Sequence, residues 1–135
     1  MTRATVSVDG RPLRIFNVHP VSPSGRPALA LWNQEWLTML SAVREEPGNL
    51  MVAGDFNTTQ HHRWYAEMKA TGMRNAHELL GRGNATTWPN GKRKLRAIRI
   101  DHVFVSDGVV PLSIREGRGE MSDHKPVMVE IALIR

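Results

Sequence analysis

The chain has no cysteine, and it has fewer acidic than basic residues, with 13 Asp and Glu and 18 Lys and Arg. The absence of cysteine excludes disulfide bonds and thiolate metal sites, and it leaves the redox state of the compartment open. No run of about 18 apolar residues is present, so no transmembrane helix is predicted. Residues 1–5 also lack the apolar region of a secretory signal. The location of the protein in the cell is left undetermined.

The composition is that of a globular domain. Of the 135 residues, 41% are hydrophobic and 23% are charged, values that are typical of folded soluble proteins rather than disordered ones. The length predicts a single domain over residues 1–135. The net charge of +5 and a pI near 10.4 favour polyanionic partners such as nucleic acid or anionic lipid.

Hydrophobic periodicity and the Pro and Gly positions predict an α+β domain with one mixed β-sheet and helices on one face. Trp32 and Trp36 lie at helical spacing with Leu29, Leu40 and Val43, and we interpret them as core residues. The long loop at residues 81–97 is of a kind that is often functional. Strands are predicted at residues 5–8, 13–18, 50–53, 98–105, 109–115 and 126–134, and helices from Pro27 to Pro47-Gly48, from a cap at Thr58-Thr59 to Gly72, and from Met73 to Leu80.

Polar residues that can carry chemistry recur where predicted strands end. The apolar run at residues 50–53 leads into Gly54-Asp55-Phe56-Asn57, in which the glycine lets the backbone turn sharply or approach a ligand closely. Asp101-His102 and Asp123-His124 occupy similar places downstream, and His19 ends the strand at residues 13–18. Strand ends that deliver Asp, Asn and His predict one active site assembled on a rigid scaffold.

Four motifs follow one another along the chain: Asn17-Val18-His19, Gly54-Asp55-Phe56-Asn57, Ile100-Asp101-His102-Val103-Phe104 and Ser122-Asp123-His124-Lys125-Pro126-Val127. In this order they resemble the endonuclease/exonuclease/phosphatase superfamily, which includes deoxyribonucleases, sphingomyelinases and inositol-polyphosphate phosphatases. The resemblance covers residues 13–131, and Thr86-Thr87-Trp88-Pro89 is similar to a bacterial subgroup. It implies a divalent-metal-dependent phosphoesterase, in which Asp123 helps to bind the cation and His19 contacts phosphate as a general acid.

The residues themselves suit phosphodiester hydrolysis, which needs an activated water and positive charge near the phosphate oxygens. Asp55 is the candidate to orient and deprotonate the water, and the Asn57 amide can hold water or phosphate. His124 would contact the phosphate in its protonated form, because a carboxylate partner, Asp101, raises a histidine pKa. Oxygen ligands from Asp55, Asn57 and Asp123 suit Mg²⁺ or Mn²⁺.

The resemblance matches only the C-terminal half of the family's four-layer fold. The first half of that fold supplies an Asn and a metal-binding Glu, and no glutamate precedes His19 in this chain. The metal site is therefore incomplete by the family pattern. The sheet face that normally packs on the first half would also be exposed, and a large apolar patch rarely stays in water. We therefore expect two copies to form a homodimer through this face.

A basic cluster precedes Asp101 and is predicted to bind nucleic acid through its phosphates. A solvated loop is the alternative, and Trp88 either stacks on a base or packs against the rim. The adjacent His61 and His62 do not point the same way on a helix or strand, which indicates surface residues rather than metal ligands. The cluster consists of Lys92, Arg93, Lys94, Arg96 and Arg99.

The sequence therefore predicts a metal-dependent phosphodiesterase, foremost a DNA nuclease with little sequence preference. A phosphatase or phospholipase of the same superfamily, acting on lipid or pyrophosphate groups, is one alternative. A truncated, inactive module that only binds DNA or a partner is the other. Taken singly, Asp55 and Asn57 could also be turn or cap residues, and His19 a loop residue.

Overall fold

The protein is described by a computed structural model over residues 1–91 and 96–134. Five strands form one sheet in the order β1-β2-β3-β5-β4, and two further strands form a separate sheet, β6-β7. The elements are β1 (Thr2–Val8), β2 (Arg11–Val18), α1 (Arg26–Glu45), β3 (Leu50–Asp55), α2 (Arg63–Ala70), β4 (Arg74–Asn75), α3 (Ala76–Leu79), β5 (Asp101–Val105), β6 (Val109–Glu116) and β7 (Val127–Leu133).

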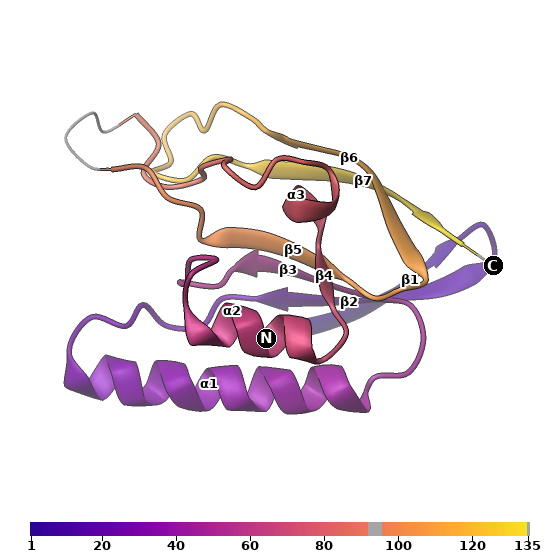
Figure 1. Ribbon diagram of the computed structural model, residues 1–135, viewed down its shortest axis with the longest axis horizontal. Helices are drawn as coiled ribbons and strands as arrows, with labels where there is room; N and C mark the ends of the chain where they lie inside the picture. Colours follow the sequence, from indigo (N-terminus) through magenta and orange to yellow (C-terminus); the bar gives the residue numbers. More distant parts are fainter. Residues whose placement is uncertain (92–95, 135) are drawn as a thin grey trace.

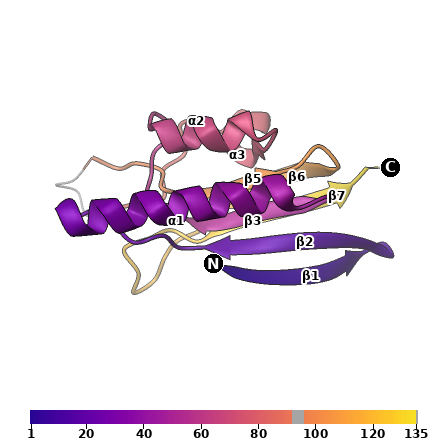
Figure 2. The ribbon, with the colours of Figure 1, turned by 90° about the horizontal axis from the view of Figure 1, so that it is seen from below.

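The five-stranded sheet is the middle layer of the molecule. Helices α1 and α2 cover one face, which we call the helix face, and the β6–β7 hairpin lies over the other, which we call the hairpin face (Figure 1). Seen from below, α1 runs along the sheet, with β1 and β2 to one side and α2 and α3 to the other (Figure 2). The predicted α+β class, with a mixed sheet and helices on one face, is confirmed.

Helix α1 packs through its aromatic side chains. It ends at Glu45, just before Pro47, and it buries Trp32 and Trp36, as the sequence predicted. Leu29 was expected on the same buried face, but it is 43% exposed because it lies in the first turn, close to the end of the helix. The stacking of Trp36 on Trp64, with ring centroids 6.0 Å apart, joins α1 to α2.

The start of α2 differs from the prediction. The helix begins at Arg63, and the His62 Nδ1 accepts the Trp64 N–H as the N-cap, so that Thr58 and Thr59 do not cap it. His61 is exposed, in agreement with its interpretation as a surface residue. The imidazole of His62 has a structural role that the sequence did not indicate.

Strands β6 and β7 correct the prediction of a single sheet. They pair only with each other, and their apolar residues Val109, Ile114 and Leu133 face Leu13 and Val105 of the larger sheet. A strand that is apolar on one side only can bury that side by stacking on the sheet, which is what this hairpin does. The hairpin face is therefore partly covered. The premise of the predicted homodimer was a bare face, so the dimer is not supported by this arrangement and stays an untested prediction.

Within the described ranges 1–91 and 96–134, no helix combines the length and the apolar character that crossing a membrane requires.

Candidate active site

Strand alternation places both candidate carboxylates on the hairpin face. In β5, His102 and Phe104 point into the helix-face core, so Asp101 and Val103 point the other way. In β3, Val52 belongs to the helix face, and Asp55 falls on the opposite side by the same period of two. The antiparallel register pairs Asp55 directly with Asp101. The two carboxylates are thus neighbours across two strands.

Gly54 allows β3 to deliver Asp55 at this point. Its φ of +146° is disfavoured for side-chain-bearing residues, and a Cβ there would lie 2.0 Å from the Val18 carbonyl oxygen. No other residue fits without moving the β2 backbone. The sequence predicted that this glycine permits a sharp turn or the close approach of a ligand. In the structure, the group that lies close to it is the backbone of strand β2.

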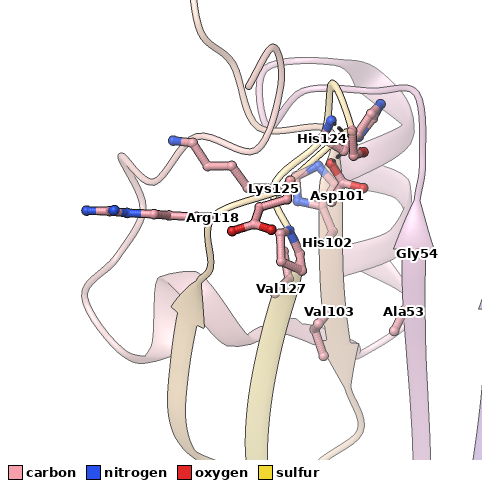
Figure 3. Close-up of a pocket in the computed structure, with 13 residues that line it drawn as sticks. Ala53, Gly54, Asp101, His102, Val103, Arg118, His124, Lys125 and Val127 are labelled. Carbon is pink, nitrogen blue, oxygen red and sulfur yellow. Dashed lines mark hydrogen bonds and ion pairs between the residues drawn. The ribbon is translucent and has the colours of Figure 1, made fainter. Parts of the chain in front are cut away.

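His124 belongs to the loop that precedes β7 and lies beside Asp101 (Figure 3). Its Nδ1 lies 2.9 Å from Asp101 Oδ2, and its Nε2 lies 3.9 Å from Asp55 Oδ2. Ligand atoms of these three residues all lie within 4.8 Å of one another. The predicted partnership of Asp101 and His124 is present in the geometry.

The environment shifts two pKa values in directions that suit catalysis. Burial raises the pKa of the Asp55 carboxyl, and the charge of Asp101 adds to this, against the hydrogen bond from the Asn57 N–H. Burial acts to lower the pKa of His124, but the hydrogen bond and charge of Asp101, with further negative charge from Asp55 and Asp123, outweigh it and raise the pKa. A carboxylate that is more basic than usual therefore lies beside an imidazole that keeps its proton more firmly than usual.

Asn57 and His19 complete the predicted set on the β2 and β3 side. The Asn57 N–H donates to Asp55 Oδ1 at 2.8 Å, and its amide nitrogen donates to the Pro20 carbonyl at 2.9 Å. Asn57 has a φ of +47°, a left-handed conformation that asparagine tolerates better than most residues. The His19 Nε2 lies 3.6 Å from Asp55 Oδ2, and its side chain is 74% exposed. Asp55 Oδ2 is thus the atom that both His19 and His124 approach.

Asp123 lies at the exposed side of the site. Its Oδ2 accepts a hydrogen bond from the Trp88 Nε1 at 3.1 Å, and its backbone carbonyl accepts the Asn90 N–H. These contacts join the loop before β7 to the loop that carries Trp88. Among the described residues, the group that could hold a metal is formed by Asp55, Asp101 and His124 and does not include Asp123.

The basic cluster is only partly described. Lys92, Arg93 and Lys94 lie outside the described residues, and Arg96 is exposed. Arg99 does not fit the prediction of a nucleic-acid contact, because it is 4% exposed and its guanidinium donates to protein acceptors. We correct the assignment of Arg99 to an internal residue that joins β5 to the loops around it.

Two residues near the site carry roles that sequence reasoning did not assign. The Thr87 hydroxyl is buried and accepts hydrogen bonds from the backbone N–H groups of Ile100 and Asp101, at 3.2 Å each, which fixes the start of β5. Lys125 lines the cavity beside His124, and its Nζ donates to Thr86 Oγ1 at 3.1 Å. The only sequence signal for either was its place inside a motif, Thr87 in 86–89 and Lys125 in 122–127.

Two cavities meet at His124. One has a volume of about 490 Å³ and is bounded by Asp101 and by Lys125, together with residues of the loop at 118–122 (Figure 3). The other, of about 520 Å³, includes His124 and Asn57 and is otherwise largely apolar, with Trp32 and Trp88 among its walls. The candidate site therefore lies between a cavity whose walls include charged side chains and a second, more apolar cavity, which we call the apolar recess.

The family resemblance implies a divalent cation at this site. The oxygen donors available are the carboxylates of Asp55 and Asp101 and the Asn57 amide oxygen, whose nitrogen is already bound to Pro20. Hard oxygen donors of this kind fit Mg²⁺ or Mn²⁺, which retain several waters. Burial is the main cause of the raised Asp55 pKa, and a cation here would relieve the repulsion from Asp101 that adds to it. The residues present fit such an ion.

The sequence model of the endonuclease/exonuclease/phosphatase family matches residues 2–124, and the chain belongs to this family. Curated relatives include a UPF0294 protein of Vibrio campbellii, 26% identical over 130 residues, and one of Vibrio vulnificus, 27% identical over 125 residues. Both matches cover 93% of this chain, but only 42% and 41% of the relatives. The chain thus spans about two fifths of the length of these relatives.

Solved structures share the fold. A 3′ phosphatase, NExo, from Neisseria, bound to a product DNA hairpin, superposes with a TM-score of 0.78 at 22% identity, covering 96% of this chain and 64% of that one. TDP2 of D. rerio with single-stranded DNA product gives 0.75 at 19% identity, covering 96% and 60%. A mannosyl-6-phosphatase of Bacteroides thetaiotaomicron gives 0.62 at 24% identity, covering 93% and 53%. These likenesses confirm the fold.

Proposed function

We propose that this chain carries a phosphoesterase site that is dependent on a divalent cation and hydrolyses phosphodiesters, with DNA as the foremost substrate. The observation that supports this best is the arrangement of Asp55 beside the Asp101–His124 pair, with His124 Nδ1 2.9 Å from Asp101 and the Asp55 pKa raised. Family membership supports phosphate-ester hydrolysis as the reaction.

Each side chain has a role in this proposal. The Asn57 N–H holds Asp55 Oδ1, so Oδ2 is turned toward the histidines, where it can orient and deprotonate a water. Asp101 keeps His124 protonated and aimed at the position of the phosphate, so that the imidazolium offsets the negative charge that develops there. His19 is exposed enough to contact a phosphate as it arrives and to protonate the leaving oxygen.

Asp55 and Asn57 would hold the cation, and Asp123 stays a candidate third ligand. The cation would supply positive charge to the non-bridging phosphate oxygens.

DNA is favoured over small phosphates by two features. The net charge is +5, and the apolar recess beside His124 has Trp88 in its wall, where a base could stack. The likeness to NExo and TDP2, whose structures hold DNA products, agrees with this preference. A phosphatase acting on lipid or sugar phosphates is the second candidate, since a mannosyl-6-phosphatase shares the fold.

The test is cleavage of supercoiled plasmid with Mg²⁺ or Mn²⁺, with EDTA, and with the Asp55→Ala variant. We expect metal-dependent nicking that Asp55→Ala reduces by about 10²-fold or more, since positioned bases contribute that much. Asp107→Ala, a change at a 91% exposed side chain, is the matched control and should cleave normally. An Asp55→Ala protein that keeps more than about a tenth of the rate contradicts the role of Asp55.

The same proteins distinguish the alternatives. Release of phosphate from a sugar phosphate or a phospholipid, with intact plasmid, would favour the phosphatase reading. Folded protein that binds DNA but cleaves no ester would favour the inactive binding module.

A further inference from the structure

Two segments that are far apart in the sequence meet beside His124. One is the loop between β6 and β7, residues 117–126, which we call the histidine loop. The other is the stretch at residues 87–90, which we call the anchor segment. The histidine loop consists of turns and irregular structure. The position of His124 therefore depends on what this loop contacts rather than on a helix or a sheet.

The backbone on both sides of His124 is bound to the anchor segment. The Asn90 N–H donates to the Asp123 carbonyl at 2.7 Å, just before the histidine. The Lys125 N–H donates to the Thr87 carbonyl at 2.8 Å, just after it. The Cα of His124 is thus held between two hydrogen bonds to the same short segment.

The side chain of Asn90 holds the histidine loop at two further points. Its Nδ2 donates to the Gly119 carbonyl at 2.5 Å and to the Ser122 carbonyl at 3.0 Å. A carboxamide nitrogen has two hydrogens to donate, so both are used here. With its backbone N–H, this one residue satisfies three carbonyl groups of the loop. Carbonyl groups in irregular structure need such partners.

The histidine loop also packs directly against Asn90. A Cβ at Gly119 would lie 2.2 Å from the His124 carbonyl oxygen and 2.7 Å from Asn90 Nδ2. Both distances are too short for any side chain, so a glycine is required at position 119. The close packing agrees with the hydrogen bonds, and both fix the loop in one arrangement.

The anchor segment holds the other member of the pair as well. The buried Thr87 hydroxyl accepts hydrogen bonds from the Ile100 and Asp101 N–H groups at 3.2 Å each. Residues 87–90 therefore contact the backbone at both Asp101 and His124. The distance of 2.9 Å between His124 Nδ1 and Asp101 Oδ2 depends on these contacts. A shift of about 1 Å in either one would break that hydrogen bond.

We propose that Asn90 is a positioning residue for His124, which holds the histidine loop in the arrangement that places the imidazole against Asp101. Asn90 acts through the backbone of the loop and not by contact with the phosphate. This inference rests on the proposed function, because the reaction that the position of His124 would serve is phosphate-ester hydrolysis.

The variant Asn90→Asp tests the proposal. The side chain keeps its size, but a carboxylate can only accept hydrogen bonds where the loop carbonyls need a donor. We expect kcat for bis(4-nitrophenyl) phosphate with Mn²⁺ to fall about tenfold or more, because small displacements of catalytic groups are costly. KM should change by no more than about twofold, as for an interaction made in the transition state.

Two further variants control for charge. Asn90→Ala removes the same two hydrogen bonds without adding a negative charge, and its kcat should fall in the same way. Asn84→Asp makes the same substitution at an exposed position seven residues or fewer before Asn90, and it should keep the native kcat. An unchanged kcat in Asn90→Asp and Asn90→Ala would overturn the proposal.

A double-mutant cycle separates positioning from a general effect on folding. In a His124→Ala background, Asn90→Asp should lower kcat by no more than about twofold, because the group that it positions is already absent. An equal fall in both backgrounds would overturn the proposal. Urea denaturation of each variant checks that the measured protein is folded.

Amide hydrogen exchange gives a measure that needs no turnover. Exchange at the Lys125 N–H, which donates to the Thr87 carbonyl, should be about tenfold faster in Asn90→Asp and native in Asn84→Asp. Amides of β5 should not change. A lower kcat without faster exchange at Lys125 would also overturn the proposal, since Asn90 would then not act through the loop.

The same measurements distinguish this inference from the proposed function. If the native protein hydrolyses no ester but exchange at Lys125 depends on Asn90, Asn90 holds the loop and the proposed hydrolysis fails. If esters are hydrolysed and neither kcat nor exchange depends on Asn90, the proposed function holds and the positioning role fails.

Discussion

The two faces of the five-stranded sheet differ in composition and in burial. The helix face is rich in aromatic side chains that are almost fully buried, including Trp36, Phe56 and Phe104. The hairpin face is aliphatic, and several of its members, such as Met51, Val129 and Ile131, are only partly buried. The carboxylates of Asp55 and Asp101 lie on the hairpin side, where β3 and β5 pair in register.

This difference shows how the site is supported. Asp55 and Asp101 are attached to strands whose other face is anchored in the aromatic core, through Phe56 and His102. His124 comes from the loop that leads into the less buried hairpin. Two of the three groups are therefore fixed by the strongest packing in the molecule, and the third depends on the weaker layer.

The largest effect is expected from Trp36→Ala on the helix face. Trp36 has no exposed surface and stacks on Trp64, so its removal should lower the free energy of unfolding by about 3–5 kcal/mol. Urea denaturation measures this. Leu37→Ala, at a 58% exposed position of the same helix, should change stability by no more than about 0.5 kcal/mol. A loss below about 1 kcal/mol in Trp36→Ala would mean that the helix face is not the more tightly packed of the two faces.

Asp101→Asn should impair catalysis rather than folding. The amide cannot hold His124 in its protonated form by charge, so turnover should fall by about 10²-fold. Because the raised pKa of His124 depends on Asp101, the alkaline limb of the pH–rate profile should move to lower pH. Rates at pH 5 to 9 measure this. An unchanged limb would show that Asp101 does not control the imidazole.

Acid should destabilise the protein through histidines on both faces. His102 has its pKa lowered to about 3, mainly by burial, and burial also lowers the pKa of His77. Since the unfolded histidine titrates near 6.5, the unfolded chain binds protons that the folded chain excludes once the pH drops below this value. Stability is thus complete above pH 6.5 and falls toward pH 3, with a loss from His102 on the order of 2 kcal/mol by pH 5.

Urea denaturation at pH 7, 6 and 5 measures the slope. Among the described residues, His102 bonds to the Thr58 carbonyl and to Arg99 and to no acidic group, whereas His77 contacts Glu116 of β6 at 3.0 Å. We therefore expect the helix-face histidine to contribute more of the slope. Stability that is flat between pH 7 and 5 would contradict the buried neutral state of His102.

The smallest effect is expected on the hairpin face. Val129 is partly buried against the sheet, so Val129→Ala should cost only about 1 kcal/mol. If the hairpin serves mainly to hold His124, the same variant should lose activity on phosphodiesters without a matching loss of stability. Parallel measurement of urea midpoint and initial rate separates the two. A loss of stability as large as that of Trp36→Ala would mean that both faces are equally well packed.

The elements near the site could be predicted because their signals are local. The apolar run before Gly54 and the period of Trp32 and Trp36 are visible within a few residues, and both elements formed as expected. The prediction that Thr58 and Thr59 cap α2 was wrong, because the imidazole of His62 is the N-cap instead. Capping depends on the local path of the chain, which composition alone leaves open.

The assignment of Arg99 failed for a different reason. In the sequence it belongs to a basic run, but in the fold it is buried just before β5 and donates to the carbonyl groups of residues 82–83. Charge in a sequence does not specify exposure, because a guanidinium can be buried wherever enough acceptors converge. The prediction of a single sheet also failed, because which strands pair is decided by contacts between segments that are far apart in the chain.

The sequence by itself determined which chemical groups stand at the strand ends, and through the family motifs it identified the class of protein. Only the tertiary structure decided that Asp55 pairs with Asp101 in register, that His124 reaches both, and that the hairpin covers the second face. The reason is physical: strand and helix periods are set by neighbours in the chain, whereas register and stacking are set by contacts between segments far apart.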